Sequence, residues 1–184
     1  MSVRNSTRSW GSVSKALHWI IVLLIINQWL IAERADSLPN GLAKLQALAW
    51  HKSFGITILM LAVVRLVWRL LNPTPELASE TKPWERSLAR LSHVLLYALI
   101  FAMPLTGWMM SSARNFPVSW FHLFQLPDLV APDKHIFEMM RNLHGLLFLA
   151  LVGVALLHVA GALKHHFVDK NDVLKRMLPF GGVK

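Results

Sequence analysis

Four long apolar blocks, each long enough to cross a lipid bilayer, constrain this chain more than any other feature. The bilayer core needs about 20 mostly apolar residues per helix, and only helices or closed barrels satisfy their backbone polar groups there. The expected spans are residues 15–32, 50–71, 88–112 and 137–165. The sequence therefore predicts an all-α membrane protein, a single domain over residues 1–184 folded as a four-helix transmembrane bundle.

The positions of the Lys and Arg residues predict how the spans are oriented. Four spans place both termini on the same side of the membrane. If that side is the cytoplasm, 13 of the 19 Lys and Arg residues lie inside and six outside, while the ten acidic residues divide evenly. Cytoplasmic loops carry the excess of Lys and Arg, so both termini are expected in the cytoplasm. The net charge of +9 thus reflects membrane topology, and we expect no nucleic-acid partner.

The absence of Cys narrows the cofactors that such a bundle can hold. Without Cys, the chain has no disulfide, no thiolate-ligated iron–sulfur cluster and no covalently attached c-type haem. The nine His residues are then the main candidates for metal ligands. Ionisable side chains inside a membrane are costly and usually serve a function, so the histidines in the spans come first.

Two histidines of the fourth span, His144 and His158, are spaced to share one helix face. Their separation of 14 residues is a rise of about 21 Å and falls about 40° short of four full turns. Each has a partner at its own depth. His18 enters with the first span from the cytoplasm, level with His158, and His51 enters with the second span from outside, level with His144. We call His18 and His158 the inner pair, and His51 and His144 the outer pair.

Two imidazoles in an apolar slot suit haem better than other metal centres. A single His near a span end is more often an interfacial anchor, but four that match in depth favour ligation. Zinc takes three or four converging ligands, and di-iron sites need carboxylates, which the middle of every span lacks. Gly55 and Gly145 leave room for a macrocycle near the outer pair. We predict two haem b groups, one held by each pair, about 20 Å apart.

Two other histidines leave the inner site open to alternatives. His93 opens the third span on the inner side, where it competes with His18 or His158 as a ligand or serves a quinone site or a hydrogen bond. His165 shares the face of His158 and is a candidate for contact with a quinone headgroup or a haem propionate. Its simpler interpretation is an interfacial histidine that reaches toward water. The loop residues His122 and His135 receive no role.

Three basic residues are candidates for binding anionic groups. Arg65 lies 14 residues after His51, at the depth of the inner pair, where a guanidinium can pair with a propionate through two hydrogen bonds. An interfacial Arg that reaches for headgroups is an equal alternative. Lys52 and Arg141 flank the outer pair, where they would bind propionates, attract an anion or contact lipid headgroups.

Several motifs together resemble those of the bacterial cytochrome b561 family, over residues 14–179 or so. They are Lys15-Ala16-Leu17-His18-Trp19; Trp50-His51-Lys52-Ser53-Phe54-Gly55; Val64-Arg65-Leu66-Val67-Trp68-Arg69 with Asn72-Pro73-Thr74-Pro75; Leu91-Ser92-His93-Val94-Leu95-Leu96-Tyr97; and the series His144, His158, His165-His166. The resemblance implies a multi-pass di-haem b cytochrome of the bacterial inner membrane. It implies the same four axial ligands: His18, His51, His144 and His158.

Some members of that family oxidise superoxide at the outer face and pass the electron to ubiquinone. The resemblance therefore implies electron transfer between an outer-face donor, with superoxide as a candidate, and membrane quinone, and superoxide:ubiquinone oxidoreductase is one activity that it suggests. Two other classes stay open. One is a cytochrome b anchor or electron-transfer subunit of a larger hydrogenase- or dehydrogenase-type complex, with a soluble redox partner. The other is a small proton channel or transporter that uses intramembrane histidines and would be colourless.

Overall fold

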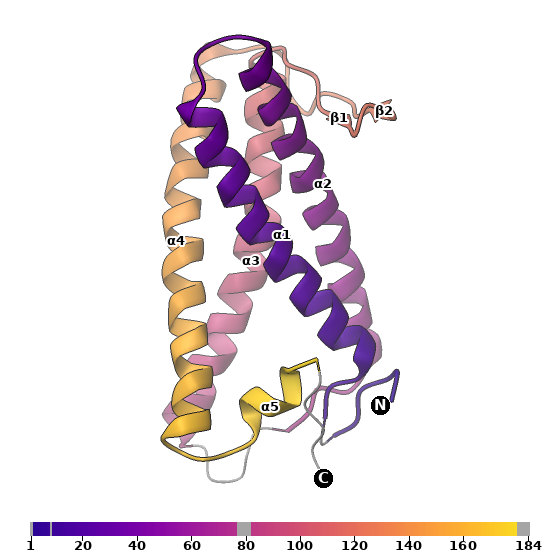
Figure 1. The fold of residues 1–184 in the computed structure, drawn as a ribbon, viewed down its shortest axis with the longest axis vertical. Coiled ribbons are helices and arrows are strands. Elements are labelled where there is room, and N and C mark those ends of the chain that lie inside the picture. Colours follow the sequence, from indigo (N-terminus) through magenta and orange to yellow (C-terminus); the bar gives the residue numbers. More distant parts are fainter. Residues whose placement is uncertain (1, 8, 77–81, 180–184) are drawn as a thin grey trace. The chain divides into compact units, whose positions relative to one another are not determined.

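The computed structural model describes residues 2–7, 9–76 and 82–179 and is mainly helical (Figure 1). The long helices are α1 (Ser12–Ser37), α2 (Leu42–Leu71), α3 (Pro83–Ala113) and α4 (Lys134–Phe167). Between α3 and α4 the chain forms a small antiparallel sheet of β1 (Ser119–Trp120) and β2 (Phe124–Gln125), and the short helix α5 (Val173–Met177) follows α4. All four long helices are long and apolar enough to cross a membrane, which confirms the predicted fold class.

Each helix contains the span predicted for it and extends beyond it at one end or both. The largest extension is at the start of α2, which begins at Leu42 instead of residue 50. The added residues, 42–49, are Leu, Ala, Lys and Gln, which are strong helix formers. Hydropathy marks only the part of a helix that is apolar enough for lipid, so it underestimates a helix that continues into the interface.

Local sequence explains where the helices begin and end. Pro73 follows α2 closely and cannot continue it, whereas Pro83 opens α3 at a position where no amide hydrogen is needed. Asp133 caps α4, because its carboxylate accepts a hydrogen bond from the amide of Ile136 (2.9 Å). After α3, Asn115 adopts the left-handed conformation (φ 57°) that commonly ends a helix.

Many large apolar side chains on these helices point away from the protein. Leu23 on α1 and Leu146 and Leu156 on α4 are each more than 60% exposed. A helix that is apolar on every side is typical of a membrane span, where lipid covers the outward side chains.

The contacts within the chain cluster into two compact units. Unit 1 consists of Met1–Ile20, Val63–Ala98 and Leu151–Lys184, and unit 2 of Ile21–Ala62 and Leu99–Ala150. Each unit contains a segment from each of α1, α2, α3 and α4. The inner pair belongs to unit 1, and the outer pair belongs to unit 2.

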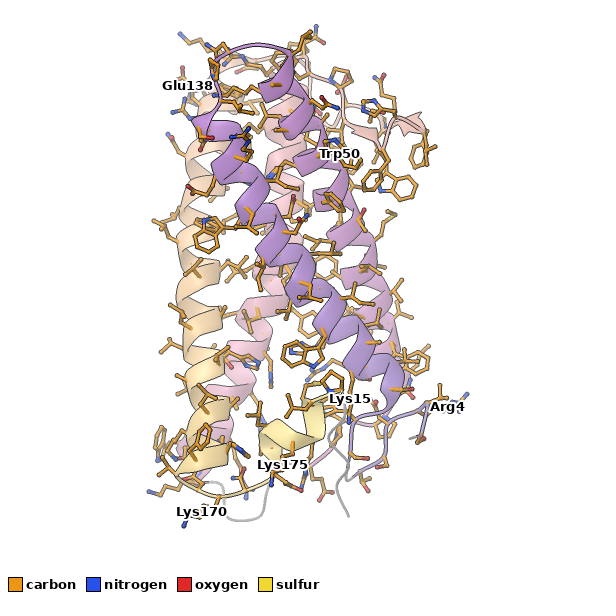
Figure 2. All side chains as sticks on the ribbon, in the orientation of Figure 1. Arg4, Lys15, Trp50, Glu138, Lys170 and Lys175 are labelled. Carbon is orange, nitrogen blue, oxygen red and sulfur yellow. The ribbon has the colours of Figure 1, made fainter. Side chains whose placement is uncertain are left out.

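Unit 1 holds the segments near both chain ends. Asn5 accepts hydrogen bonds from the Gly11 amide (3.0 Å) and the Ser14 hydroxyl (2.7 Å) and donates one to the Pro73 carbonyl (3.0 Å). The Trp19 indole donates to the carbonyl of Met177 (2.9 Å) and so ties α5 to α1. Basic side chains gather at one end of this unit, where Figure 2 labels Arg4, Lys15, Lys170 and Lys175.

In unit 2 the small sheet is bonded to α2. The Phe121 amide donates to the Ser53 hydroxyl (3.0 Å), and the Trp120 indole donates to the Thr57 hydroxyl (3.1 Å). The turn between the strands places both Phe121 (φ 47°) and His122 (φ 61°) in the left-handed region, which side chains rarely adopt. The segment between α3 and α4 therefore contains a hairpin that packs on α2.

Candidate functional site

The inner pair forms a ring contact between α1 and α4 within unit 1. The ring centroids of His18 and His158 lie 6.5 Å apart, and the ring planes are inclined at 70°. Neither side chain is fully exposed, and the Arg65 guanidinium is close enough to act electrostatically on both rings. The two rings expected to share one depth therefore lie next to each other.

His93 of α3 also contacts the His158 ring. Its ring centroid is 5.1 Å from that of His158, with an interplanar angle of 63°. Three imidazoles thus gather in unit 1, but the spacing of His93 from His158 is shorter than that of the inner pair. The described residues contain no group of three histidines whose nitrogens converge within metal-binding distance.

Arg65 is held by an aromatic residue, Tyr97 of α3, in a contact that the sequence does not predict. Its Nε donates to the Tyr97 hydroxyl (3.2 Å), and its guanidinium carbon lies 5.9 Å from the Tyr97 ring centroid. Arg69 lies over the same ring at 5.6 Å. No carboxylate among the described residues is paired with either guanidinium. Arg65 and Arg69 are four residues apart in α2, and this spacing is the feature of the sequence that places both on one face of the helix.

The outer pair repeats the geometry of the inner pair within unit 2. The ring centroids of His51 on α2 and His144 on α4 lie 6.4 Å apart, and the planes are inclined at 71°. Both side chains are partly buried. The two pairs therefore share one spacing and one relative orientation, although different helices supply the second partner of α4.

Two residues of α3 that are not among the predicted site residues, Thr106 and Gly107, support the His144 ring. The Thr106 hydroxyl lies 3.0 Å from its Nδ1. A Cβ on Gly107 would lie 3.3 Å from its Cε1, which is a tight contact. A buried hydroxyl at the depth of a functional histidine was the available signal, but the sequence does not show which face of α3 turns toward α4.

His51 is supported from α1 instead. The Gln28 side chain donates from Nε2 to the backbone carbonyl of His51 (2.9 Å). The same Nε2 would lie 3.2 Å from a Cβ on Gly55, so the space in front of Gly55 is filled by this amide. Gly145 faces open space. Gln28 therefore joins α1 to α2, as expected of a polar residue within a span.

The His165 side chain is part of an ionic cluster near the end of α4. Its Nδ1 lies 2.9 Å from Oδ2 of Asp169 and 3.2 Å from the side-chain nitrogen of Asn171. The neighbouring Lys164 lies 2.8 Å from both Glu85 and Asp169 and holds the pKa of the Asp169 carboxyl below its usual value. Glu85, His165 and Asp169 have the donor atoms of a metal site, but the Lys164 ammonium already supplies the positive charge there.

Lys52 is also committed to a structural contact. Its Nζ donates to the Pro117 carbonyl (2.8 Å) and to the Ser111 hydroxyl (3.3 Å). Arg141 is exposed, as are the unassigned residues His122 and His135. Of the two cations expected to flank the outer pair, Lys52 is bonded within the protein, whereas Arg141 makes no hydrogen bond or ion pair with the residues that the structure describes.

Comparison with known proteins identifies the family. The profile described as prokaryotic cytochrome b561 matches residues 9–180. "Cytochrome b561 homolog 2" of Escherichia coli K12 is 34% identical over 97% of this chain and 95% of its own length. "Probable superoxide oxidase CybB" of Yersinia pestis is 28% identical (94% and 97%), and "Cytochrome b561 homolog 1" of E. coli K12 is 29% identical (89% and 93%). The chain therefore belongs to the prokaryotic cytochrome b561 family of haem-b membrane electron-transfer proteins.

Proposed function

We propose that this protein transfers electrons between a donor at the outer face of the bacterial inner membrane and membrane quinone through two haem b groups. The inner pair would ligate one haem and the outer pair the other. When bound, haem supplies one-electron redox chemistry, while the chain supplies position, burial and tuning of the potential.

The spacing of the two ring pairs carries this proposal. An imidazole nitrogen lies about 1.2 Å from its ring centroid and binds a transition metal at about 2.0 Å, so two rings across one iron have centroids about 6.4 Å apart. The observed separations are 6.5 Å for the inner pair and 6.4 Å for the outer pair. The residues present therefore fit two bis-imidazole sites.

The residues beside the inner pair suit the acidic groups of a haem. Arg65 and Arg69 bring two guanidinium groups to Tyr97, and a guanidinium binds a carboxylate through two parallel hydrogen bonds. A propionate at Arg65 would neutralise charge that no described carboxylate neutralises. His165, whose Nδ1 contacts Asp169, would offer its other ring nitrogen to a quinone headgroup or a propionate.

The proposed donor and orientation rest on the relatives and on charge. The similarity to a protein named as a probable superoxide oxidase makes superoxide the first donor to test, and the exposed Arg141, three residues before His144, would favour an anion. The excess of Lys and Arg on the side of the termini supports a cytoplasmic position for both ends. The basic side chains at one end of unit 1 agree with this orientation (Figure 2).

Spectroscopy of the purified protein tests the proposal directly. We expect a low-spin b-type spectrum and two haems per chain by pyridine haemochrome. His51→Ala or His144→Ala should lose one haem, and His18→Ala or His158→Ala should lose the other. His135→Ala is the control and should retain both, because the structure places this exposed histidine in the first turn of α4, and not in the loop expected from the sequence, and gives it no contact with either pair. A colourless protein from haem-sufficient cells would overturn the assignment.

The donor and acceptor need a separate kinetic measurement. Stopped-flow mixing of the oxidised protein with superoxide should reduce the haems, and added ubiquinone should reoxidise them. If ubiquinol reduced the haems and superoxide did not, the assignment of two haems would stand, but superoxide would be refuted as the donor.

A further inference from the structure

We infer that Thr106 is the positioning residue of the outer site: its hydroxyl accepts a hydrogen bond from Nδ1–H of His144 and so presents Nε2 of that ring as the iron ligand. This inference rests on the proposed haem ligation by the outer pair. It adds a residue, a tautomer and a direction of tuning.

The hydrogen bonds of Thr106 decide the tautomer. Its oxygen lies 3.0 Å from the carbonyl of Ala102, 2.9 Å from that of Met103 and 3.0 Å from Nδ1 of His144. A hydroxyl has one proton and two lone pairs, and a carbonyl can only accept. If Thr106 gave its proton to His144, both carbonyl contacts would lack a proton. If it donates to a carbonyl and accepts from Nδ1–H, both the hydroxyl and the ring are satisfied.

The surroundings of Thr106 make this arrangement specific. Thr106 is only 7% exposed, so water does not readily replace a lost bond. Gly107 closes the adjacent side of the ring, because any Cβ there would lie 3.3 Å from Cε1 of His144. The hydroxyl and the glycine together fix both the rotation of the ring and its approach to α3.

The partner ring has no comparable support. Nδ1 of His51 is buried and has no hydrogen-bond partner among the residues that the structure describes. The Gln28 contact reaches the His51 backbone and not its ring. The outer site is therefore asymmetric. The His144 ring is held by a hydrogen bond with α3, whereas for His51 only the backbone of its helix is held, by Gln28.

This asymmetry has a consequence for the redox potential. An imidazole that binds a metal through one nitrogen becomes more basic when its other nitrogen donates a hydrogen bond to an acceptor. A more basic ligand favours the oxidised iron, which carries the greater positive charge. Thr106 should therefore lower the reduction potential of the outer haem and strengthen its retention.

Removal of the hydroxyl at constant shape tests the inference. Thr106→Val should raise the midpoint potential of the outer haem, which is identified as the haem missing from His51→Ala. It should leave the potential of the other haem unchanged. It should also weaken retention of the outer haem by about 10-fold or more. Thr106→Ser should behave like the wild type. Thr57→Val is the matched control, because it removes a hydroxyl of unit 2 that bonds Ser53 and Trp120 and no histidine.

The outcomes separate this inference from the proposed function. If Thr106→Val loses the outer haem entirely, Thr106→Cys, a weaker acceptor, should show a partial rise in the potential. An unchanged potential and unchanged haem retention in Thr106→Val, with two haems in the wild type, would overturn the role of Thr106 alone. A wild-type protein without haem would overturn the proposed function itself.

Discussion

His93 and His158 have ring centroids 5.1 Å apart, which is 1.4 Å closer than the 6.5 Å between His18 and His158. Two imidazoles that held one iron between them would have ring centroids about 6.4 Å apart, so His93 is too near His158 to be its partner in such a site. The geometry therefore favours His18 over His93 as the partner of His158, and the substitution below also tests the other alternative, in which His93 takes the place of His158.

Substitution of His93 tests this distinction. His93→Ala should retain two haems per chain with a low-spin spectrum, whereas His18→Ala should retain one. The measurement is the haemochrome count together with the reduced-minus-oxidised spectrum. Loss of a haem in His93→Ala and its retention in His18→Ala would reverse the assignment.

Gly107→Ala should distort the outer site. The added Cβ would lie 3.3 Å from Cε1 of His144, and overpacking of this kind costs about 1–3 kcal/mol. We expect a lower melting temperature and less haem at the outer site. Gly153→Ala is the control, because its Cβ would meet nothing within 4 Å, and alanine favours a helix. Equal melting temperatures for the two variants would show that the His144 ring moves aside without cost.

Lys52→Gln should loosen the loop between α3 and α4. The ammonium donates to the Pro117 carbonyl, and hydrogen bonds of charged groups contribute about 1.5–3 kcal/mol, with less expected where water reaches the pair. Limited chymotrypsin digestion should therefore cut the exposed residues Leu123 and Phe124 several-fold faster than in the wild type. Arg141→Gln, which changes an exposed cation of α4, should leave the cleavage rate unchanged. Equal rates in both variants would instead favour a role for Lys52 in attracting anions.

The Asp169 cluster should make stability depend on pH. Lys164 holds the pKa of Asp169 below its usual value, so the ion pair is fully stabilising above that usual value and is lost as the pH falls through the lower, folded-state pKa. Thermal unfolding followed by Trp fluorescence should show a melting temperature that falls below about pH 4.

The matching variants isolate the contribution of this carboxyl. Asp169→Asn should be less stable at neutral pH and lose less on acidification than the wild type. Asp128→Asn, an exposed loop residue, should follow the wild-type curve. If the melting temperature of Asp169→Asn depended on pH as that of the wild type does, the acid sensitivity would come from other groups.

The sequence by itself determined the spans, because the length and apolar character of a membrane helix are properties of consecutive residues. It also determined which histidines lie at equal depth, because the rise per residue is constant along a helix and four antiparallel spans order the depths. The positions of His18, His51, His144 and His158 needed only these two rules.

Only the tertiary structure decided what supports each ring. The rotation of α3 about its axis sets whether Thr106 or a neighbouring residue meets His144, and packing against the other helices determines that rotation. In the same way, the sequence places Lys52 beside the outer pair and His165 beside the inner pair, but hydrogen bonds from distant segments commit them to Pro117 and Asp169. Depth follows from position along one helix, whereas side-chain partners depend on how several helices pack together.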